Sequence, residues 1–374
     1  MAKSRASRGV FGERVTPRTP DRNSFTPPVF GTRWERTAKG PGGWEGFVNE
    51  VADSAPTNSV APSANASQII GTDPGYVAGT WSSGTPAFTR WESSATGVGS
   101  WSTAAATMPN ANSAPTSTEH LLYLRVIETN DGVEAASAAT GKVVFNPATI
   151  TGLQLWLDPT DTATLFQTTD TSTPALLDAA AVGRINDKSG NSGREAIQAT
   201  AANKPTLKLN ILNGLQVLRT DGGDRVVSTF GSTLSQPATI FLVIKWSAIG
   251  TSARIAIDGI DASNRNYLAV NTAGTNYEIF AGASINRGTP DTNWHVITVR
   301  YDGANSFIRD NGAQVGAVFN SGAHAATGMT LGSGYNNAAS MTGDIAQVIR
   351  AGTLSAGDIT LIEAHLNNKF ALNP

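Results

Sequence analysis

Carboxylates are the side chains that could cleave a glycosidic bond, and the glutamates among them are sparse beyond residue 150 of this sequence. Glycoside hydrolysis needs a carboxylic acid and a second carboxylate held a few ångströms apart. Glu195, Glu278 and Glu363 are the only glutamates after residue 150, and each is isolated. Pairs of aspartates could do this work in principle. The pattern nevertheless predicts that the protein is not an enzyme and has no catalytic residues.

Nucleophilic and zinc-dependent chemistry lack their usual residues. The sequence has no cysteine, which excludes disulfides, thiolate zinc sites and a cysteine nucleophile. The four histidines lie far apart, no Gly-x-Ser-x-Gly elbow occurs, and no glycine-rich loop runs into Lys-Ser or Lys-Thr. Stability must therefore come from buried apolar cores.

Oxygen ligands for a calcium ion are more plentiful. Asp158 and Asp161 lie in one turn, and Asp187 stands in a second polar loop. Calcium takes about six to eight oxygen ligands, so these loops could hold it if they converge. Asp, Asn and Gly are also ordinary turn residues, and no Asp-x-Asp-x-Asp-Gly spacing occurs. The turn interpretation and the calcium interpretation both stay open.

Two turn regions have the side chains that bind sugars, which are aromatic rings beside amide and charged groups. They are Asn264, Arg265 and Tyr267 in one region, and Tyr335, Asn336 and Asn337 in the other. The alternative is that both regions are solvated loop tips. Sequence alone does not say whether they meet.

The elements that would position these loops are mostly strands. Segments 238–246, 253–260, 266–272, 277–285 and 294–303 are apolar and β-branched, and 306–318 contains the hairpin turn signal Asp310-Asn311-Gly312. Many strands without intervening helices predict a two-sheet jelly roll. One helix is expected at the end, capped by Ser355 and Asp358, with an apolar stripe at Ile359, Ile362, Leu366 and Phe370.

Four segments of residues 150–374 carry a family resemblance. They are LQLWLDPTDTATL (153–165), INDKSGNSGREAIQATAANKPTL (185–207), LNGLQVLRTDGGDRVVS (212–228) and TLSAGDITLIEAHLNNKF (353–370). This block resembles concanavalin A-like lectin and laminin-G-like jelly rolls. The resemblance implies a curved β-sandwich that binds carbohydrate or protein, with calcium at loops in many relatives. Some relatives are glycoside hydrolases, but their Glu-x-Asp-x-Glu motif is absent here.

Residues 59–147 predict a smaller β-sandwich. Apolar residues alternate along 121–128, and Asn130-Asp131-Gly132 then supplies a hairpin turn. With Trp91 in the place of a core tryptophan, this block resembles the immunoglobulin-like or fibronectin-like modules of phage virion proteins. Trp81, Trp91 and Trp101 recur every ten residues. They are interpreted as core and edge residues, with a sugar-stacking platform as the alternative.

Residues 1–58 predict an extended docking arm. Residues 1–44 carry nine basic and three acidic side chains, a net charge of +6, so the other 330 residues carry −8. Prolines interrupt any regular element, and aromatic residues that could anchor in a partner recur along the segment. The predicted docking residues are Arg14, Arg18, Phe25, Phe30, Arg33, Trp34, Trp44 and Phe47. A mobile tail and a nucleic-acid-binding tail are the alternatives.

Together these parts predict an all-β protein with three segments: an arm (1–58), an immunoglobulin-like sandwich (59–147) and a jelly roll (150–374). The N-terminus lacks an apolar signal-peptide core, and no apolar run is long enough to span a membrane. We therefore expect a phage or phage-like virion surface protein, a tail fibre or a capsid-mounted fibre or decoration, made in the host cytoplasm. Its partners would be other virion proteins and a host glycan, bound in many copies. A purely structural decoration protein and a glycoside hydrolase are the alternatives.

Overall fold

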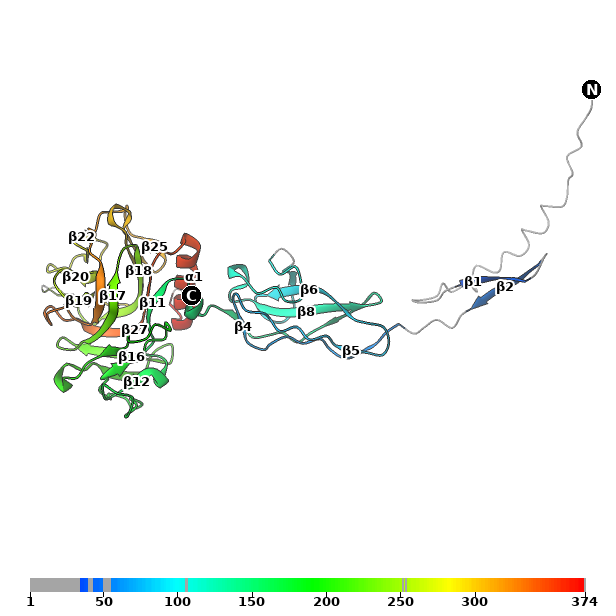
Figure 1. Ribbon diagram of the computed structural model, residues 1–374, viewed down its shortest axis with the longest axis horizontal. Helices are drawn as coiled ribbons and strands as arrows, with labels where there is room; N and C mark the ends of the chain where they lie inside the picture. Colours follow the sequence, from blue (N-terminus) through cyan, green and yellow to red (C-terminus); the bar gives the residue numbers. More distant parts are fainter. Residues whose placement is uncertain are drawn as a thin grey trace, which may run out of the picture. The chain divides into compact units, whose positions relative to one another are not determined.

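The computed structural model describes residues 34–39, 43–49, 55–104, 107–250, 252 and 254–372. The chain divides into a smaller unit (1–67, 73–113 and 122–141) and a larger unit (68–72, 114–121 and 142–374). The described part is almost entirely β-structure, which confirms the predicted fold class (Figure 1). None of the helices found there combines the length and apolarity needed to cross a bilayer.

Residues 34–49 contain a two-stranded antiparallel sheet, which corrects the expectation of an irregular arm. β1 (Trp34–Lys39) pairs with β2 (Gly43–Asn49), with a shift of register between Thr37 and Ala38. Aromatic and β-branched residues on both segments favour extended backbone. Three predicted docking residues, Trp34, Trp44 and Phe47, belong to these strands. The other five, Arg14, Arg18, Phe25, Phe30 and Arg33, lie outside the described residues.

The smaller unit is built on a four-stranded antiparallel sheet. Its order is β7 (Ser102–Thr103), β6 (Ala87–Ser94), β8 (Tyr123–Asn130) and β9 (Val133–Ala136), and β3 (Asn58–Val60) pairs separately with β5 (Thr80–Trp81). Asp131 and Gly132 take φ values of 46° and 82° in the predicted β8–β9 turn. Trp91 is fully buried with Leu124 and Val126, which confirms its interpretation as a core residue.

A buried carboxylate holds the β5 segment of the smaller unit against β8. Glu128 is fully buried and accepts hydrogen bonds from the Tyr76 hydroxyl at 3.0 Å, from the Gly79 amide and from Trp81 Nε1 at 2.6 Å. Trp81 therefore serves this network rather than an exposed platform. Burial and the bond to Glu128 raise the pKa of Tyr76 to about 12.

The larger unit contains two antiparallel sheets. The eight-stranded sheet runs β15 (Thr206–Leu212), β16 (Leu215–Asp221), β27 (Thr342–Ala351), β18 (Ala238–Trp246), β23 (His295–Tyr301), β24 (Phe307–Asp310) and β25 (Ala313–Gln314), with β11 (Leu153–Leu157) also paired to β27. The nine-stranded sheet runs β12 (Leu165–Phe166), β13 (Arg184–Ile185), β14 (Ala196–Ile197), β17 (Val226–Leu234), β26 (Ala326–Leu331), β19 (Arg254–Asp258), β20 (Tyr267–Val270), β21 (Tyr277–Phe280) and β22 (Ser284–Arg287).

Short elements complete this unit. β4 (Gln68–Ile69) and β10 (Val143–Val144) form a parallel pair. Single 3₁₀ turns occupy Ser117–Glu119, Pro147–Thr149, Thr162–Thr164, Ala201–Asn203 and Gly303–Asn305. Asp161 caps the third of these, because its carboxylate accepts the Ala163 amide at 3.2 Å.

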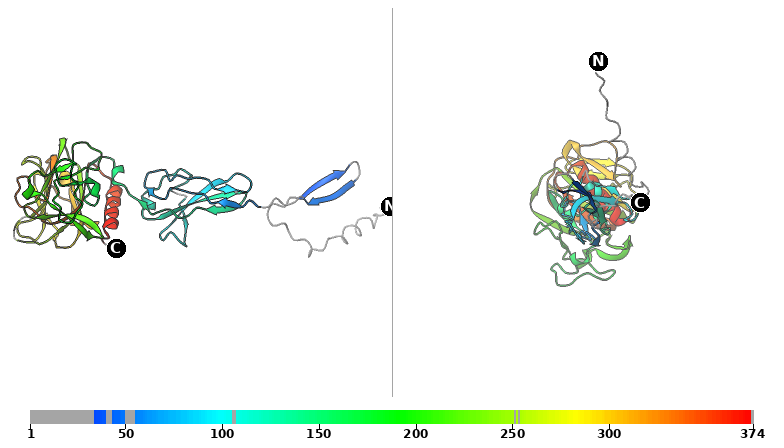
Figure 2. Two further views of the ribbon diagram at one scale, coloured as in Figure 1. Left: turned by 90° about the horizontal axis from the view of Figure 1, so that it is seen from below. Right: turned by 90° about the vertical axis from the view of Figure 1, so that its right-hand side faces the viewer.

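The predicted helix α1 (Ala356–Phe370) lies against the outer face of the eight-stranded sheet (Figure 2). Ser355 and Asp358 form the reciprocal cap that the sequence predicted, with the Ser355 hydroxyl accepting the Asp358 amide at 3.1 Å. The stripe residues are buried against β16, β18, β23 and β27. Helix α1 thus covers the outer face of the eight-stranded sheet at these strands.

One predicted strand is two strands, and this difference shapes the site. Residues 277–285 form the antiparallel pair β21–β22 rather than one continuous strand. Gly282 lies between them with φ of 111°, a conformation that side chains with a Cβ rarely adopt. Ala281 amide also bonds the Ser321 carbonyl at 2.7 Å, which fixes the turn. Phe280 consequently stands at a strand end on the outer face.

Candidate functional site

The outer face of the nine-stranded sheet carries an aromatic cluster on β20 and β21. Leu268 and Val270 of β20 enter the main core, whereas Tyr267 and Ala269 face the other side and pack with Phe280. Tyr267 lies directly opposite Phe280 in the antiparallel register, and their rings stack with centroids 5.1 Å apart and planes at 12°. The register of one strand pair thus brings two rings together away from the core.

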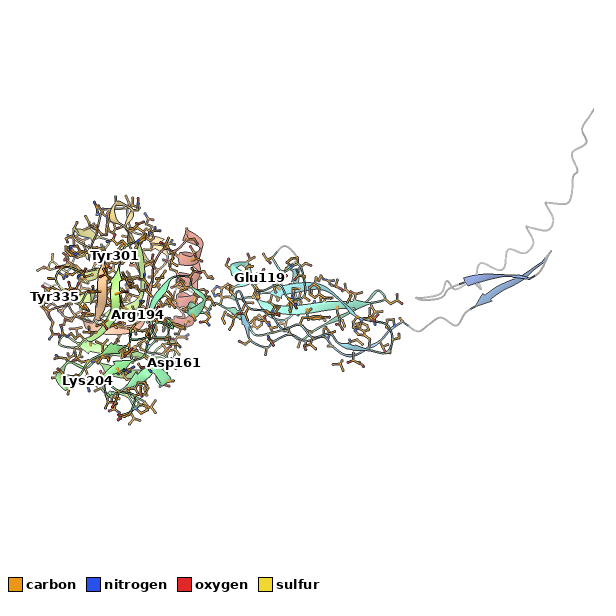
Figure 3. The ribbon with its side chains drawn as sticks, in the orientation of Figure 1. Glu119, Asp161, Arg194, Lys204, Tyr301 and Tyr335 are labelled. Carbon is orange, nitrogen blue, oxygen red and sulfur yellow. The ribbon has the colours of Figure 1, made fainter. Side chains whose placement is uncertain are left out.

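Arg265 brings a cation to this cluster and Tyr335 a third ring. The guanidinium carbon of Arg265 lies 4.8 Å from the ring centroid of Tyr267, 5.3 Å from Phe280 and 4.8 Å from Tyr335. Such cation–π contacts contribute about 0.5–2 kcal/mol each, more as water is excluded. Tyr335 belongs to the loop between β26 and β27, on the side of the larger unit away from α1 (Figure 3). Strands β20 and β21 and the β26–β27 loop therefore each bring one ring to the same guanidinium.

Asp258, at the end of β19, fixes the orientation of the guanidinium. Its oxygens accept two bonds from Arg265, at 2.9 and 2.7 Å, and the side chain of Asp258 is fully buried. The same carboxylate accepts the backbone amides of Gly259 at 2.7 Å and Tyr335 at 3.1 Å. Burial alone would lower the pKa of Arg265, but the bond and charge of Asp258 raise it above its ordinary value. The cation is therefore permanent and held in place.

Glu278 anchors the far edge of the cluster. One of its oxygens accepts the Tyr267 hydroxyl at 2.5 Å and the Ser284 hydroxyl at 2.6 Å. Burial and this bond raise the pKa of Tyr267 well above its usual value, so the phenol stays protonated at neutral pH. The arrangement keeps the Tyr267 ring flat against Phe280 rather than activating its oxygen for attack.

Polar groups border the rings on the solvent side. Asn336 and Asn337 are exposed, and within the described part of the chain their amide nitrogens make no hydrogen bond. About 20% of the Arg265 side chain is exposed, while Tyr335 and Phe280 are half-buried. The surface therefore combines aromatic edges, a fixed guanidinium and free amide donors.

The six predicted sugar contacts fall into two groups in the structure. Arg265, Tyr267 and Tyr335 are brought into direct contact, and Asn336 and Asn337 follow Tyr335 in the same loop. Asn264 is instead tied to Asp261, to which its side-chain amide donates at 3.1 Å. Asp261 also accepts the Thr327 hydroxyl at 2.9 Å, so this corner is a closed loop network. Whether these residues bind sugar stays a prediction.

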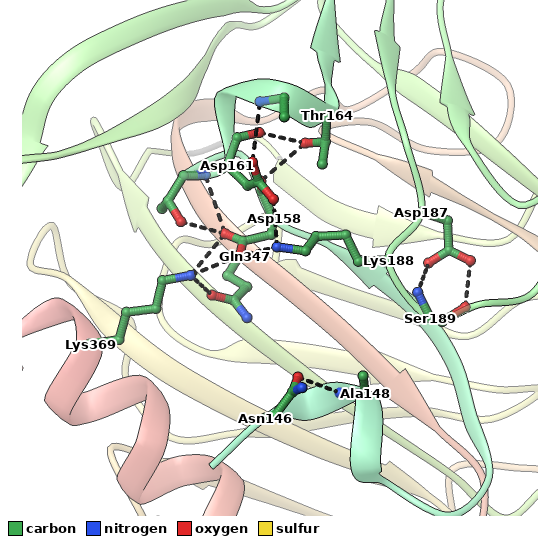
Figure 4. A network of polar contacts seen from close by, with 12 residues as sticks. Asn146, Ala148, Asp158, Asp161, Thr164, Asp187, Lys188, Ser189, Gln347 and Lys369 are labelled. Atoms are coloured by element: carbon green, nitrogen blue, oxygen red, sulfur yellow. Dashed lines mark hydrogen bonds and ion pairs between the residues drawn. The ribbon is translucent and has the colours of Figure 1, made fainter. Parts of the chain in front are cut away.

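Two of the three predicted calcium ligands, Asp158 and Asp161, are engaged with lysine ammonium groups (Figure 4). Lys369 Nζ lies 2.8 and 3.0 Å from the two oxygens of Asp158, and Lys188 Nζ lies 2.7 Å from Asp161. Asp187 lies apart from this network, where it accepts the amides of Trp156 at 2.8 Å and Ser189 at 2.9 Å. Among the described residues, no group of three or more His, Asp or Glu is placed to hold a metal. The calcium site stays a prediction, and these contacts count against it.

Sequence reasoning missed Phe280, Asp258 and Glu278. Phe280 lies within 277–285, which the sequence predicts as one strand, although Gly282, two residues later, is a turn signal. Asp258 directly follows an apolar run, and no sequence spacing around it indicates that Arg265 is its partner. Glu278 lies between the core residues Tyr277 and Ile279. This alternation of apolar and polar residues is the sequence signal that Glu278 faces outward.

The known proteins that this chain resembles do so in structure alone. No protein-family model and no curated protein matches the sequence. A sialidase of Trypanosoma rangeli in complex with sialic acid matches at 8% identity and a TM-score of 0.39, over 68% of this chain and 44% of the sialidase. The binding domain of botulinum neurotoxin DC with SialylT matches at 13% and 0.39, over 57% of this chain and 51% of that one.

A further match is domain 4 of an extracellular arabinanase from Geobacillus stearothermophilus in complex with arabinotriose, at 14% identity and a TM-score of 0.35. It covers 57% of this chain and 98% of that domain. This chain spans less than half the length of the matched sialidases. All these TM-scores lie below 0.5, so the likenesses assign neither a family nor an activity to this chain.

The expectation that the protein is not an enzyme is corrected at this point. Sialidases stand among the matched structures, so the exclusion of catalysis drawn from the sparse glutamates does not hold. The same likenesses, at 8–9% identity and TM-scores of 0.38–0.40, assign no enzymatic activity to this chain either.

Proposed function

We propose that the protein is a surface protein of a phage or phage-like particle and that its larger unit binds a host-surface glycan. The binding face is the outer face of the nine-stranded sheet at Arg265, Phe280 and Tyr335, with the buried Tyr267 ring supporting them from beneath. The observation that carries the proposal is the set of three rings gathered around one fixed guanidinium. Aromatic rings cover the apolar faces of sugars, and convergent polar groups bond their hydroxyls.

The exposed amides of Asn336 and Asn337 supply the hydrogen-bond donors that a sugar needs. The Arg265 charge is matched by Asp258, and Glu278 adds a further carboxylate at the edge. A single site of this size is shallow and weak. Many copies on one particle would raise its effective strength, because the second and later contacts become intramolecular.

The particle assignment is supported by the order of the segments in the sequence. A basic, aromatic-rich N-terminal segment precedes two β-units, as expected for a fibre or decoration that docks by one end. The protein would be made in the host cytoplasm and displayed on the virion surface. Residues 1–58 would bind other virion proteins, on the tail or on the capsid.

A glycan array probed with the full-length protein tests the binding proposal. The wild type should bind at least one class of host polysaccharide, Tyr335→Ala should lose that signal, and Trp101→Ala should keep it. Trp101 is a matched control because it also lies under a guanidinium, that of Arg125 at 4.4 Å, but in the smaller unit. A wild type that binds no host glycan would contradict the proposal and favour a purely structural decoration protein. New reducing ends released from the polysaccharide would favour a glycoside hydrolase.

Deletion of residues 1–55 tests the docking proposal. The truncated protein should no longer join particles, while both β-units keep their circular dichroism and unfolding transitions. Incorporation of the full-length protein should weaken as salt rises, because the segment carries a net positive charge. Incorporation of the truncated protein at the wild-type level would refute the docking arm.

A further inference from the structure

A fully buried arginine lies between the two sheets of the larger unit. Arg350 is 1% exposed on β27, where Val348, two residues before it, enters the main core. Alternation along a strand places both side chains on the same, inward face. A guanidinium cannot be neutralised by losing its proton at physiological pH, so its charge must be compensated where it lies.

The hydrogen-bond partners of Arg350 are neutral. Its Nε donates to Gln154 Oε1 at 2.9 Å and its Nη1 donates to Asn266 Oδ1 at 3.2 Å. Its Nη2 is buried and has no partner, and throughout the described residues no carboxylate lies within 4.0 Å of the group. Burial lowers the pKa of Arg350 to about 10, an effect that a nearby carboxylate would oppose.

A second cation lies close by and adds to the imbalance. The guanidinium carbons of Arg350 and Arg194 lie 5.4 and 5.5 Å from the centroid of the same Phe230 ring. Arg194 Nη1 donates to the Gln154 backbone carbonyl at 2.6 Å, and it too forms no ion pair in the described part of the chain. Arg194 belongs to the larger unit (Figure 3) and is partly exposed. One ring and one glutamine thus join two cations. Arg194 interacts electrostatically with Asp187, whereas Arg350 is buried and forms no ion pair among the described residues.

From this geometry we infer that the larger unit binds a small monovalent anion, of halide or nitrate size, at Nη2 of Arg350. A water molecule could accept the free N–H groups, but it would leave the buried positive charge of Arg350 uncompensated, with the charge of Arg194 nearby opposing it. Each uncompensated buried ion carries a desolvation penalty of several kcal/mol, which the ring contact only partly offsets. Only a small anion is proposed, because Arg350 is 1% exposed and lies between the sheets. This site is independent of the glycan-binding face.

Thermal unfolding of the full-length protein at constant ionic strength tests the inference. Replacing sodium isethionate, whose anion is too bulky for the site, by sodium chloride or bromide should raise the Tm of the larger unit by about 2–4 °C. That shift corresponds to about one kcal/mol for a unit of this size. Arg350→Gln should abolish the difference between anions. Arg219→Gln, which removes an arginine already paired with Asp344 at 2.7 Å, should leave it intact. Equal Tm values in all salts would overturn the inference.

Diffraction from wild-type crystals grown in bromide keeps the test decisive if Arg350→Gln fails to fold. An anomalous bromide peak within hydrogen-bond distance of Nη2 is the expected result. Density for water alone at that position, with bromide found only at the protein surface, would refute the anion site.

Discussion

The ion pair between Arg265 and Asp258 gives the sharpest prediction about the candidate site. The Asp258 side chain is fully buried, while about 20% of the Arg265 side chain is exposed. In Arg265→Gln the carboxylate would keep its two backbone donors, from Gly259 and Tyr335, but lose the cation paired with it. Removing one partner of a buried pair costs about 3–5 kcal/mol, because the remaining charge stays buried. For a unit of this size that loss lowers Tm by about 6–20 °C.

The double variant Asp258→Asn/Arg265→Gln separates the buried charge from lost packing. It removes both charges, so most of the lost stability should return, although the contacts of the guanidinium with three rings do not. The assay is the unfolding of the full-length protein followed by calorimetry, and the comparison is made on the transition that Arg265→Gln shifts. The reasoning is refuted if Arg265→Gln costs less than about 1 kcal/mol or if the double variant is no more stable than the single one.

Two further predictions concern buried carboxyl groups outside the site. Burial, with the neighbouring charge of Asp221, raises the pKa of Asp224 to about 6, so its protonated form is favoured in the folded state. The contribution of Asp224 to the unfolding free energy is therefore full below about pH 4, and as much as about 3 kcal/mol of it is lost as pH rises through 6. Asp224→Asn should remove this loss from the plot of unfolding free energy against pH. Parallel plots for the wild type and the variant would disprove the prediction. In the smaller unit, Glu128→Gln presents an amide to the donors of Tyr76, Gly79 and Trp81 and should cost about 1.5–3 kcal/mol. Glu134→Gln, whose side chain is half exposed in its pair with Arg90, should cost less than about 1 kcal/mol in the same denaturant titration; equal losses would show that the Glu128 network adds nothing.

Features set by local signals could be predicted from the sequence. The cap at Ser355 and Asp358 and the apolar stripe after it specify α1, because helix capping and amphipathicity involve residues three or four positions apart. The Asn-Asp-Gly turn after β8 and the run that becomes β18 are equally local. Two-sheet architecture then follows from many strands without crossover helices.

Features set by distant pairings could not be predicted in the same way. Lys369 reaches Asp158 from more than two hundred residues away, so no spacing around Asp158 reveals that an ammonium ion occupies its oxygens. The sequence marks Tyr335 and Arg265 only as aromatic and polar loop residues. Their contact depends on the pairing of β26 with β19, which in turn pairs with β20. Phe280 lies in the cluster because the chain turns at Gly282 between β21 and β22, which the sequence does not predict.

The central claim is tested most directly by the affinity for the glycan that gives the strongest array signal. Calorimetric titration would measure this affinity for the full-length wild type, Tyr335→Ala and Trp101→Ala. Tyr335→Ala keeps the backbone bonds that hold its loop, the amide to Asp258 and the carbonyl to Arg225, so the loop should stay in place. We expect this variant to bind at least tenfold more weakly than the wild type, about 1.4 kcal/mol, and Trp101→Ala to bind as the wild type does. Unchanged affinity in Tyr335→Ala, or a loss confined to Trp101→Ala, would contradict a glycan site on the outer face of the nine-stranded sheet.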